Sequence, residues 1–397
     1  MSQEKKMAQD KVRFGVIGIG NMGSSHVTFI NQGKDCVLTA VCDCNPKAFD
    51  RIPAAIREKV KCYDEASKLI NDPEVDVVVV AVPHYSHPDM AIMAMQAGKH
   101  VLVEKPLAVH KAEAERVIAE AKKYPNLVKA LMLNQRTIPA HIKVKQLIDS
   151  GELGQIRRVC WTITDWFRTQ YYYDSGDWRA SWRGEGGGVL TNQCPHQLDL
   201  FQWFFGLPSK VRASAKLGKF HNIEVEDEVN AYMEYADGMT ANFIASTGEC
   251  PGVNRLEITA ERGLLILENR NEISFRRNEV EMTEYSRTAT KGFAPPAVWD
   301  CKIPAALPTV AGHQVIIENV AAAVLGKAQL ISPLEEGIRG LELGNAMLYS
   351  GLNDCTVELP LDSAAYAGML DKLVENSRYQ KKTVKAEGKG DDFSGSY

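Results

Sequence analysis

Between residues 11 and 138 the chain alternates short apolar runs with longer amphipathic segments. The runs at 13–19, 37–43, 76–82, 101–104 and 128–133 are predicted to be strands, with helices between them, most clearly at 111–123. The valine-rich run at 77–82 is apolar on both faces, which is typical of a central parallel strand. The alternation predicts a doubly wound α/β domain built on a parallel sheet.

A glycine turn, Gly18-Ile19-Gly20-Asn21-Met22-Gly23, directly follows the first predicted strand. Missing side chains in such a turn let the backbone approach a pyrophosphate, whose charge meets a helix N-terminus. Asp43 ends the second predicted strand and is placed to accept hydrogen bonds from the ribose hydroxyls. Because Asp43 would repel a 2′-phosphate and no arginine immediately follows it, NAD is expected rather than NADP.

The charge balance and the lengths of the apolar runs exclude nucleic-acid and membrane partners. The 397 residues carry 46 Lys and Arg against 50 Asp and Glu, a formal charge of −4, which provides no basic field for nucleic acid. No apolar run approaches the roughly 18 residues of a membrane span, and the first ten residues lack the apolar core of a signal peptide. A cytoplasmic protein with no nucleic-acid or membrane partner is therefore expected.

The nine cysteines do not form a recognisable metal or disulfide pattern. They include no C-x-x-C pair, which fits reduced cytosolic thiols. Cys42 and Cys44 would share a strand face, but two thiols without a nearby histidine make a poor zinc site. No bound metal is expected.

After Gly151 the pattern changes to longer strand-like stretches, at 157–167, 210–217, 228–235, 239–246, 255–260 and 264–268. Asp237-Gly238 and Arg262-Gly263 separate paired runs and indicate tight hairpins, so the sheet should be mostly antiparallel. Helices are expected at 314–325 and 334–352, packed back against one of the domains. The predicted organisation is a flexible start at 1–10, a nucleotide-binding domain at 11–138, an α+β domain for substrate binding and oligomerisation at 139–380, and a tail at 381–397.

Polar residues follow two of the predicted parallel strands at the end where such sheets bind ligands. Pro83, His84 and His87 follow one strand, and Glu104-Lys105-Pro106 ends the next. A histidine beside a turn is often only a cap, and a lysine at a strand end is often a solvated charge. A partly desolvated lysine, however, can have a lowered pKa and serve as an acid or base.

A third polar group follows Gly186-Gly187-Gly188. A helix is expected from about residue 189 to 205, with Asn192, His196 and Asp199 on one face and an apolar stripe on another. Upstream lies a stretch rich in aromatic residues and arginine. Its members suit sugar binding through stacking and hydrogen bonds, or alternatively domain packing or an oligomer surface: Trp166, Arg168, Tyr172, Asp177, Trp178 and Arg179.

With the glycine turn, Glu104-Lys105-Pro106 and His196 in this order, the chain resembles the glucose-fructose oxidoreductase and inositol dehydrogenase (Gfo/Idh/MocA) family over about residues 11–379. The resemblance implies a Rossmann domain followed by an open antiparallel sheet. It also implies that Lys105 and His196 act on a sugar hydroxyl. The family commonly has Asp where this chain has Asn192, and an amide cannot accept a proton, so a Lys-Asp-His relay does not carry over intact.

The roles implied are a base or proton shuttle for His196, an orienting and polarising cation for Lys105, and hydrogen-bonding positioning for Asn192. Asp199 either fixes the ring of His196 or is structural. The expected cofactor contacts are Gly18, Gly20, Asn21, Met22, Gly23, Asp43, Pro83, His84, His87, Glu104, Lys105, Trp178 and Arg179. The expected sugar contacts are Lys105, Asn134, Trp166, Arg168, Tyr172, Asp177, Asn192 and His196.

Trp178-Arg179 with the glycine run is similar to a branch of the family acting on glycosides and anhydrosugars, often at C3. Three functions stay open: an NAD-dependent dehydrogenase, a redox-neutral glycoside hydrolase that oxidises C3, eliminates, adds water and re-reduces, and a sensor that kept the cofactor site but lost catalysis. A homodimer or homotetramer formed through the C-terminal sheet is expected, because exposed sheet faces are usually covered.

Overall fold

The computed structural model describes residues 11–176 and 178–381, and the chain divides into two compact units. Unit 1 contains the described residues up to Thr137 together with Thr309–Ile338. Unit 2 contains Ile138–Pro308 together with the described residues from Arg339 onward. The chain therefore leaves unit 1, returns to it for thirty residues, and leaves it again.

Unit 1 is built on a six-stranded sheet in the order β3-β2-β1-β4-β5-β6, with every neighbouring pair parallel. Its strands are β1 Val12–Ile17, β2 Cys36–Cys42, β3 Lys61–Tyr63, β4 Val77–Val80, β5 His100–Val103 and β6 Lys129–Leu131. Its helices are α1 Asn21–Gln32, α2 Ala54–Arg57, α3 Ala66–Ile70, α4 His87–Gln96, α5 Lys111–Ala121 and α10 Gly312–Val324. The predicted doubly wound Rossmann fold is confirmed.

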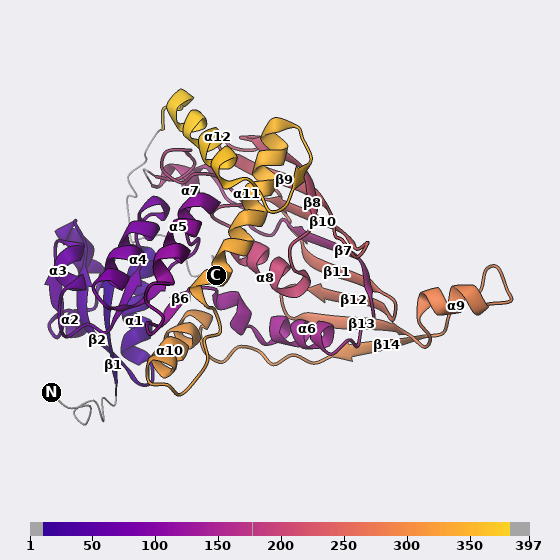
Figure 1. Ribbon diagram of the computed structural model, residues 1–397, viewed down its shortest axis with the longest axis horizontal. Coiled ribbons are helices and arrows are strands. Elements are labelled where there is room, and N and C mark those ends of the chain that lie inside the picture. The colour runs from indigo at the N-terminus through magenta and orange to yellow at the C-terminus, as the bar shows by residue number, and fades with distance from the viewer. Residues whose placement is uncertain (1–10, 177, 382–397) are drawn as a thin grey trace. The chain divides into compact units, whose positions relative to one another are not determined.

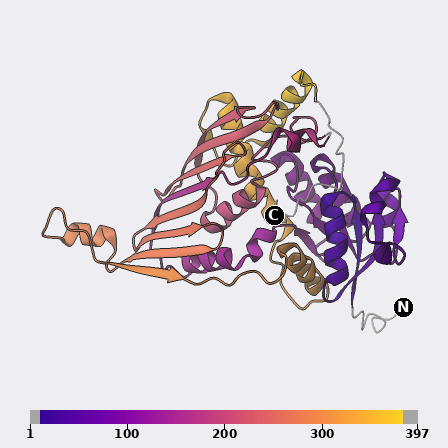
Figure 2. The same cartoon turned by 180° about the vertical axis from the view of Figure 1, so that it is seen from behind.

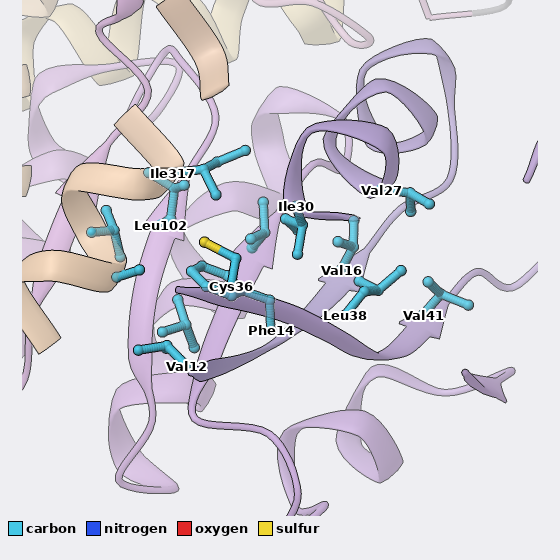
Figure 3. Packing of buried hydrophobic residues seen from close by; sticks show 14 of the residues in the cluster. Val12, Phe14, Val16, Val27, Ile30, Cys36, Leu38, Val41, Leu102 and Ile317 are labelled. Atoms are coloured by element: carbon cyan, nitrogen blue, oxygen red, sulfur yellow. The ribbon is translucent and has the colours of Figure 1, made fainter. Parts of the chain in front are cut away.

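One apolar cluster joins the sheet of unit 1 to two helices that are distant in sequence (Figure 3). Val16 of β1 and Leu102 of β5 are fully buried, as are Ile30 of α1 and Ile317 of α10. Each buried side chain of this size contributes on the order of 2 kcal/mol to folding. The late segment carrying α10 is therefore part of the Rossmann core.

Unit 2 is built on a nine-stranded sheet in the order β14-β13-β12-β11-β7-β10-β9-β8-β15. Its strands are β7 Ile156–Ile163, β8 Lys210–Leu217, β9 Glu226–Glu234, β10 Thr240–Ser246, β11 Asn254–Ala260, β12 Gly263–Glu268, β13 Glu272–Asn278, β14 Val298–Ile303 and β15 Val357–Glu358. Its helices are α6 Pro139–Asp149, α7 Gln170–Asp174, α8 Pro195–Phe205, α9 Met282–Thr288, α11 Gly337–Asn353, whose first two residues belong to unit 1, and α12 Ser363–Asn376. Among the described strands of this sheet, β7 and β10 are the one neighbouring pair that is parallel, so the predicted mainly antiparallel sheet is confirmed.

Aromatic side chains fasten α8 to the sheet of unit 2. The ring of Trp161 in β7 stacks against Phe201 and Phe204 of α8, with centroids 6.4 Å away in both cases. Phe243 of β10 meets Phe201 edge-on at 5.9 Å. The helix α6 packs against α8, while α9 lies beyond the ends of β13 and β14 (Figures 1 and 2). The position of α8 on the sheet is therefore set by its apolar face.

The predicted elements differ from the observed ones at several places, and the helices α6, α7, α9 and α12 were not predicted. Strands at Lys61–Tyr63, Glu272–Asn278, Val298–Ile303 and Val357–Glu358 were not expected. Lys61–Tyr63 and Val357–Glu358 are too short to show a pattern, whereas Glu272–Asn278 and Val298–Ile303 do alternate apolar and polar residues and were missed. The helix expected from about residue 189 begins only at Pro195, which occupies its first turn. Proline is favoured at the first helical position, so the apolar stripe runs on upstream without helical structure. Among the described residues, no helix is long and apolar enough to cross a bilayer.

Candidate active site

The glycine turn of unit 1 has the shape of a cradle for a pyrophosphate. Gly18 has φ +90, and a Cβ there would lie 2.4 Å from the carbonyl oxygen of Ala81. A Cβ on Gly23 would lie 1.7 Å from the carbonyl oxygen of Gly18, whereas a Cβ on Gly20 would meet nothing within 4 Å. Gly20 also caps α1 without any side-chain hydrogen bond, which leaves the first-turn N–H groups for an anion.

Asp43 holds this turn in place. Its Oδ2 accepts a hydrogen bond from the backbone N–H of Ile19 at 2.8 Å, and its Oδ1 accepts one from the N–H of Asn45 at 2.8 Å. A carboxylate has further lone pairs, so these bonds leave it able to accept from ribose hydroxyls. Arg51 lies nearby, because its Nη1 donates to Oδ1 of Asn21 at 2.6 Å. Sequence spacing did not single out Arg51, which lies well beyond Asp43 in the chain.

His87, in the segment after β4, bonds through its ring to the backbone at the ends of two strands. Its Nδ1 lies 2.7 Å from the carbonyl oxygen of Pro106, and its Nε2 lies 2.8 Å from that of Val82. Burial lowers the pKa of His87, although both backbone contacts oppose that shift. His84 is buried with its ring 5.8 Å from that of His87, while Pro83 is exposed. His87 thus ties two strand ends together, and its expected cofactor contact stays a prediction.

Glu104 and His26 form a buried pair under the strand end that carries Lys105. Oε1 of Glu104 lies 2.7 Å from Nε2 of His26, and its Oε2 accepts from the backbone N–H of Lys105 at 3.1 Å. Burial would raise the pKa of Glu104, but the bond to His26 and the charges of His26, His313 and Lys105 outweigh it and lower the pKa to about 2. Lys105 is half-buried, between a buried anion and the cis bond to Pro106.

Asn134 follows β6 and is buried against a histidine from the returning segment. Its Nδ2 lies 3.2 Å from Nδ1 of His313, and its Oδ1 has no hydrogen-bond partner among the described residues. The ring of His313 stacks on Phe29 with centroids 5.8 Å apart, and burial lowers the pKa of His313 to about 4. His313 was not predicted, since it reaches this place only through the late return of the chain to unit 1.

In unit 2 the predicted aromatic residues and arginines gather around Tyr172. Its hydroxyl accepts from Nη1 of Arg179 at 3.1 Å and from Nε2 of Gln193 at 3.2 Å. The guanidinium carbons of Arg168 and Arg179 lie 5.0 Å and 4.6 Å from its ring centroid. Gln193 was not predicted, and its buried Oε1 has no hydrogen-bond partner among the described residues.

Trp166 and Trp178 extend this cluster. Trp166 is 4% exposed, with the guanidinium carbons of Arg168 and Arg270 lying 5.4 Å and 4.5 Å from its ring centroid. Its Nε1 donor has no partner among the described residues. The guanidinium of Arg179 also lies over Trp178, at 4.6 Å. Asp177, expected as a sugar contact, lies outside the described residues.

The glycine run of unit 2 wraps a buried carboxyl group that sequence reasoning missed. A Cβ on Gly188 would lie 1.9 Å from the backbone oxygen of Glu226, which accepts from the N–H of Val189 at 2.9 Å. Oε1 of Glu226 accepts from the N–H of Leu190 at 3.1 Å, while its Oε2 has no partner among the described residues. Burial raises the pKa of Glu226 to about 7. The glycines are therefore required for this close approach.

Asn192 and His196 follow the wrapped segment. The side-chain amide of Asn192 donates from Nδ2 to Oε1 of Glu185, a second buried carboxyl group. His196 lies in the first turn of α8 and is 6% exposed. Asp199 accepts a hydrogen bond from Nε2 of Gln202 at 2.9 Å, one turn further along the helix. Asn192 is thus presented by a loop and His196 by a helix, and not both by one helix face as expected.

Two family models match the chain. Residues 12–131 match the oxidoreductase family with NAD-binding Rossmann fold, and residues 141–266 match the GFO/IDH/MocA C-terminal domain. Together the matches cover more than half of the chain. The protein therefore belongs to the Gfo/Idh/MocA family of NAD-binding oxidoreductases, as the resemblance implied.

Three relatives illustrate its similarities. The inositol 2-dehydrogenase of Salmonella paratyphi B is 34% identical over 148 residues, a match that spans 36% of this chain and only 43% of that enzyme. The levoglucosan dehydrogenase of Pseudarthrobacter phenanthrenivorans is 26% identical over 402 residues, covering 88% of this chain and 98% of that enzyme. The crystal structure of the WlbA dehydrogenase from Bordetella pertussis, in complex with NADH and UDP-GlcNAcA, matches with a TM-score of 0.73 and 26% identity over 89% of this chain and all of that one.

Proposed function

We propose that the protein is an NAD-dependent dehydrogenase that oxidises a secondary hydroxyl, at C3, of a pyranose, glycoside or anhydrosugar. The observation that carries this proposal is the group of buried polar atoms around Tyr172. The Trp166 Nε1 donor and the Gln193 Oε1 acceptor lack partners among the described residues. Each sugar hydroxyl both donates and accepts, so a polyhydroxylated ligand is complementary to such a group. The similarity to levoglucosan dehydrogenase supports the same substrate class.

The cofactor proposed is NAD, bound by unit 1. The pyrophosphate would lie over Gly20 at the N-terminus of α1, where no side chain intrudes, and Asp43 would accept from the adenosine ribose. NAD is preferred to NADP because the half-buried carboxylate of Asp43 would face a 2′-phosphate. The contacts expected for His84, Trp178 and Arg179 are part of this proposal.

In the proposed reaction, bound NAD supplies the hydride acceptor, and the protein supplies orientation and proton transfer. His196 accepts the hydroxyl proton through its imidazole. Lys105 orients and polarises the same hydroxyl with its ammonium group, while its backbone N–H donates to the buried Glu104. Asn192 positions the sugar by hydrogen bonding and takes no proton.

A homodimer or homotetramer formed through the sheet of unit 2 is also proposed. Large side chains are exposed on its strands, with Tyr232 of β9 at 41% and Trp299 of β14 at 54%. Native mass spectrometry and sedimentation of the full chain test this: a monomer at micromolar concentration would contradict it.

The test of function is incubation with NAD and a panel of pyranosides, anhydrosugars and aryl glycosides, following NADH and released aglycone together. Net NADH formation with no aglycone release supports the dehydrogenase. Aglycone release without NADH accumulation would instead indicate redox-neutral glycoside cleavage. Sugar binding with neither product would indicate a sensor.

Lys105→Ala is the sharpest variant for the mechanism. NADH formation should fall at least about a thousandfold, because loss of an acid–base or polarising group costs roughly 10²–10⁴ in rate. The dissociation constant of NAD should change less than about threefold, as measured by quenching of tryptophan fluorescence. The control is Lys122→Ala, which removes an exposed lysine directly after α5 in the same unit. Unchanged turnover in Lys105→Ala would contradict the assignment.

A further inference from the structure

Asn192 is held by a buried carboxylate for which the reaction as proposed has no use. We propose that Glu185 is a positioning residue that fixes the side-chain amide of Asn192 so that its Oδ1 faces the sugar hydroxyl. This inference rests on the proposed sugar oxidation. It assigns an atom of Asn192 to the substrate, and it explains how an amide works where family members commonly carry a carboxylate.

The first step of the argument is that Glu185 is itself rigid. Its side chain is buried, and the residue is 1% exposed. Oε2 accepts from the backbone N–H of Ala180 at 2.7 Å, and the backbone N–H of Glu185 donates to the carbonyl of Ser181 at 2.9 Å. Ala180 has φ +61, a conformation that costs an alanine on the order of 1 kcal/mol. The chain is thus bent unfavourably at the residue whose N–H meets Glu185.

The second step is that the backbone of Asn192 is also fixed. Its N–H donates to the carbonyl of Gly188 at 2.9 Å, and Gly188 in turn packs against the backbone of Glu226. With the backbone held and the amide group placed next to Glu185, the remaining choice is which side of the planar amide, Nδ2 or Oδ1, faces the carboxylate. The bond to Glu185 decides between these two orientations.

The third step concerns donors and acceptors. An ionised carboxylate only accepts hydrogen bonds, so Oε1 of Glu185 selects the NH₂ side of the amide. Burial raises the pKa of Glu185 above its ordinary value, while the charges of Arg179 and Lys381 and the hydrogen bonds from Asn192 and Ala180 oppose that shift. This selection applies at pH values above that raised pKa, where the carboxylate is ionised. The amide oxygen of Asn192 then points away from Glu185. The site gains a neutral acceptor for a hydroxyl, with the negative charge kept one side chain further back.

The test exchanges the acid and the amide. Glu185→Gln keeps an oxygen that accepts from Ala180 but presents an NH₂ group to Asn192, which favours the reversed orientation of the Asn192 amide. The KM for the sugar should therefore rise about tenfold. The kcat and the NAD dissociation constant should each change less than about threefold. Asn192→Asp places two carboxylates next to each other and should lower the free energy of unfolding. The double variant E185Q/N192D restores one donor and one acceptor, and should return KM to within about threefold of the wild type.

Two measurements separate this inference from the proposed function. The equilibrium constant for unfolding is measured in urea, without sugar, for the wild type, the two single variants and E185Q/N192D. In the double variant this constant should be at least fivefold smaller than the value expected if the effects of the two single substitutions simply multiplied, which is a recovery of stability. Absence of that recovery overturns the contact whatever the reaction is. Recovery of stability without recovery of KM would show a merely structural role and overturns the inference. If the wild type oxidises no sugar of the panel, the proposed function is wrong, and so is the role of Asn192 Oδ1 in binding the sugar. The unfolding measurements still test the contact between Glu185 and Asn192 in that case.

Discussion

Glu226 shows at the scale of one residue how the glycine run and a buried acid depend on each other. Glu226 is fully buried, and the segment from Gly188 to Leu190 folds around it. Burial, with a smaller contribution from the charge of Glu185, raises the pKa of Glu226 to about 7. Backbone donors to the carboxyl group oppose this shift without cancelling it. The native protein therefore keeps a proton there at pH values where the unfolded chain has lost it.

Glu226→Gln should change how stability depends on pH. Between the ordinary value of 4.5 and about 7 the unfolded chain ionises Glu226 while the folded protein does not, so the wild type loses about 3 kcal/mol of unfolding free energy as pH rises through that window. The variant lacks this loss, so its stability relative to wild type should rise by about 3 kcal/mol from pH 4.5 to pH 7.5. Urea unfolding at a series of pH values measures it.

The matched control is Glu234→Gln, at an exposed position of the same strand β9. It should leave the pH profile of unfolding close to that of the wild type. Parallel profiles for Glu226→Gln and wild type would mean that Glu226 is ionised in the folded protein at neutral pH.

Candidate site residues next to a strand end could be selected from the sequence, whereas residues that depend on partners distant in the chain could not. Asp43 and Lys105 could be selected because a turn or a proline marks their places. Glu226 and His313 carry no local signal, because each gains its surroundings from a segment that lies elsewhere in the chain, as with Asn134 and His313. Glu185 bonds to the nearby Ala180 and Asn192, but apolar periodicity gives no sign of its burial. His87 has a structural partner on each ring nitrogen, the backbone carbonyls of Pro106 and Val82, which the sequence did not predict, and its cofactor contact stays a prediction.

At the scale of elements, hydrophobic periodicity located most strands to within about two residues but failed at the start of α8. The apolar stripe was correctly placed, but the residues before Pro195 are occupied in wrapping Glu226 and turn instead of forming a helix. A pattern of apolar spacing does not report such a constraint, because the partner strand β9 comes later in the chain. The short strand β3 was missed for a simpler reason, since Lys61–Tyr63 offers no buried run.

Replacing glycine by alanine should lower the stability at Gly188 but weaken NAD binding at Gly20. Gly188→Ala forces a methyl group into the backbone of Glu226 and should lower the unfolding free energy by about 2 kcal/mol or more. Gly20→Ala meets open space and should change it by less than about 1 kcal/mol, but the methyl group occupies the approach of the pyrophosphate. The NAD dissociation constant of Gly20→Ala should rise about tenfold, equivalent to 1.4 kcal/mol.

Thermal unfolding and NAD titration of both glycine variants make this comparison. A Gly20→Ala protein that binds NAD as the wild type does would place the pyrophosphate elsewhere. A Gly188→Ala protein of wild-type stability would show that the wrapped segment shifts without cost.

At the scale of the whole molecule, unit 1 is completed by residues that follow almost all of unit 2 in sequence. The segment around β6 is bonded to this return: the N–H of Leu131 donates to the carbonyl of Ser332 at 3.1 Å, and the Ser332 hydroxyl donates to the carbonyl of Leu131 at 2.7 Å. Arg136 is paired with Glu336 in the same region. Of the two late helices expected to pack back against one of the domains, α10 belongs to unit 1, whereas all but the first two residues of α11 belong to unit 2.

Unit 1 should therefore fold only when the returning segment is present. Residues 11–137 alone expose the surface that Ile316, Ile317 and Val320 cover, each fully buried and worth on the order of 2 kcal/mol. Joining 309–338 to residue 137 through a short glycine–serine linker is feasible, because Gly312 lies beside Thr137. The joined protein should unfold cooperatively by circular dichroism and bind NAD within about tenfold of the full chain, since the glycine turn and Asp43 belong to this unit. The shorter fragment should show neither property, and the joined protein carrying Ile317→Asp should behave like the fragment. Cooperative unfolding and NAD binding by 11–137 alone would show that the buried contacts of α10 are dispensable to the nucleotide-binding core.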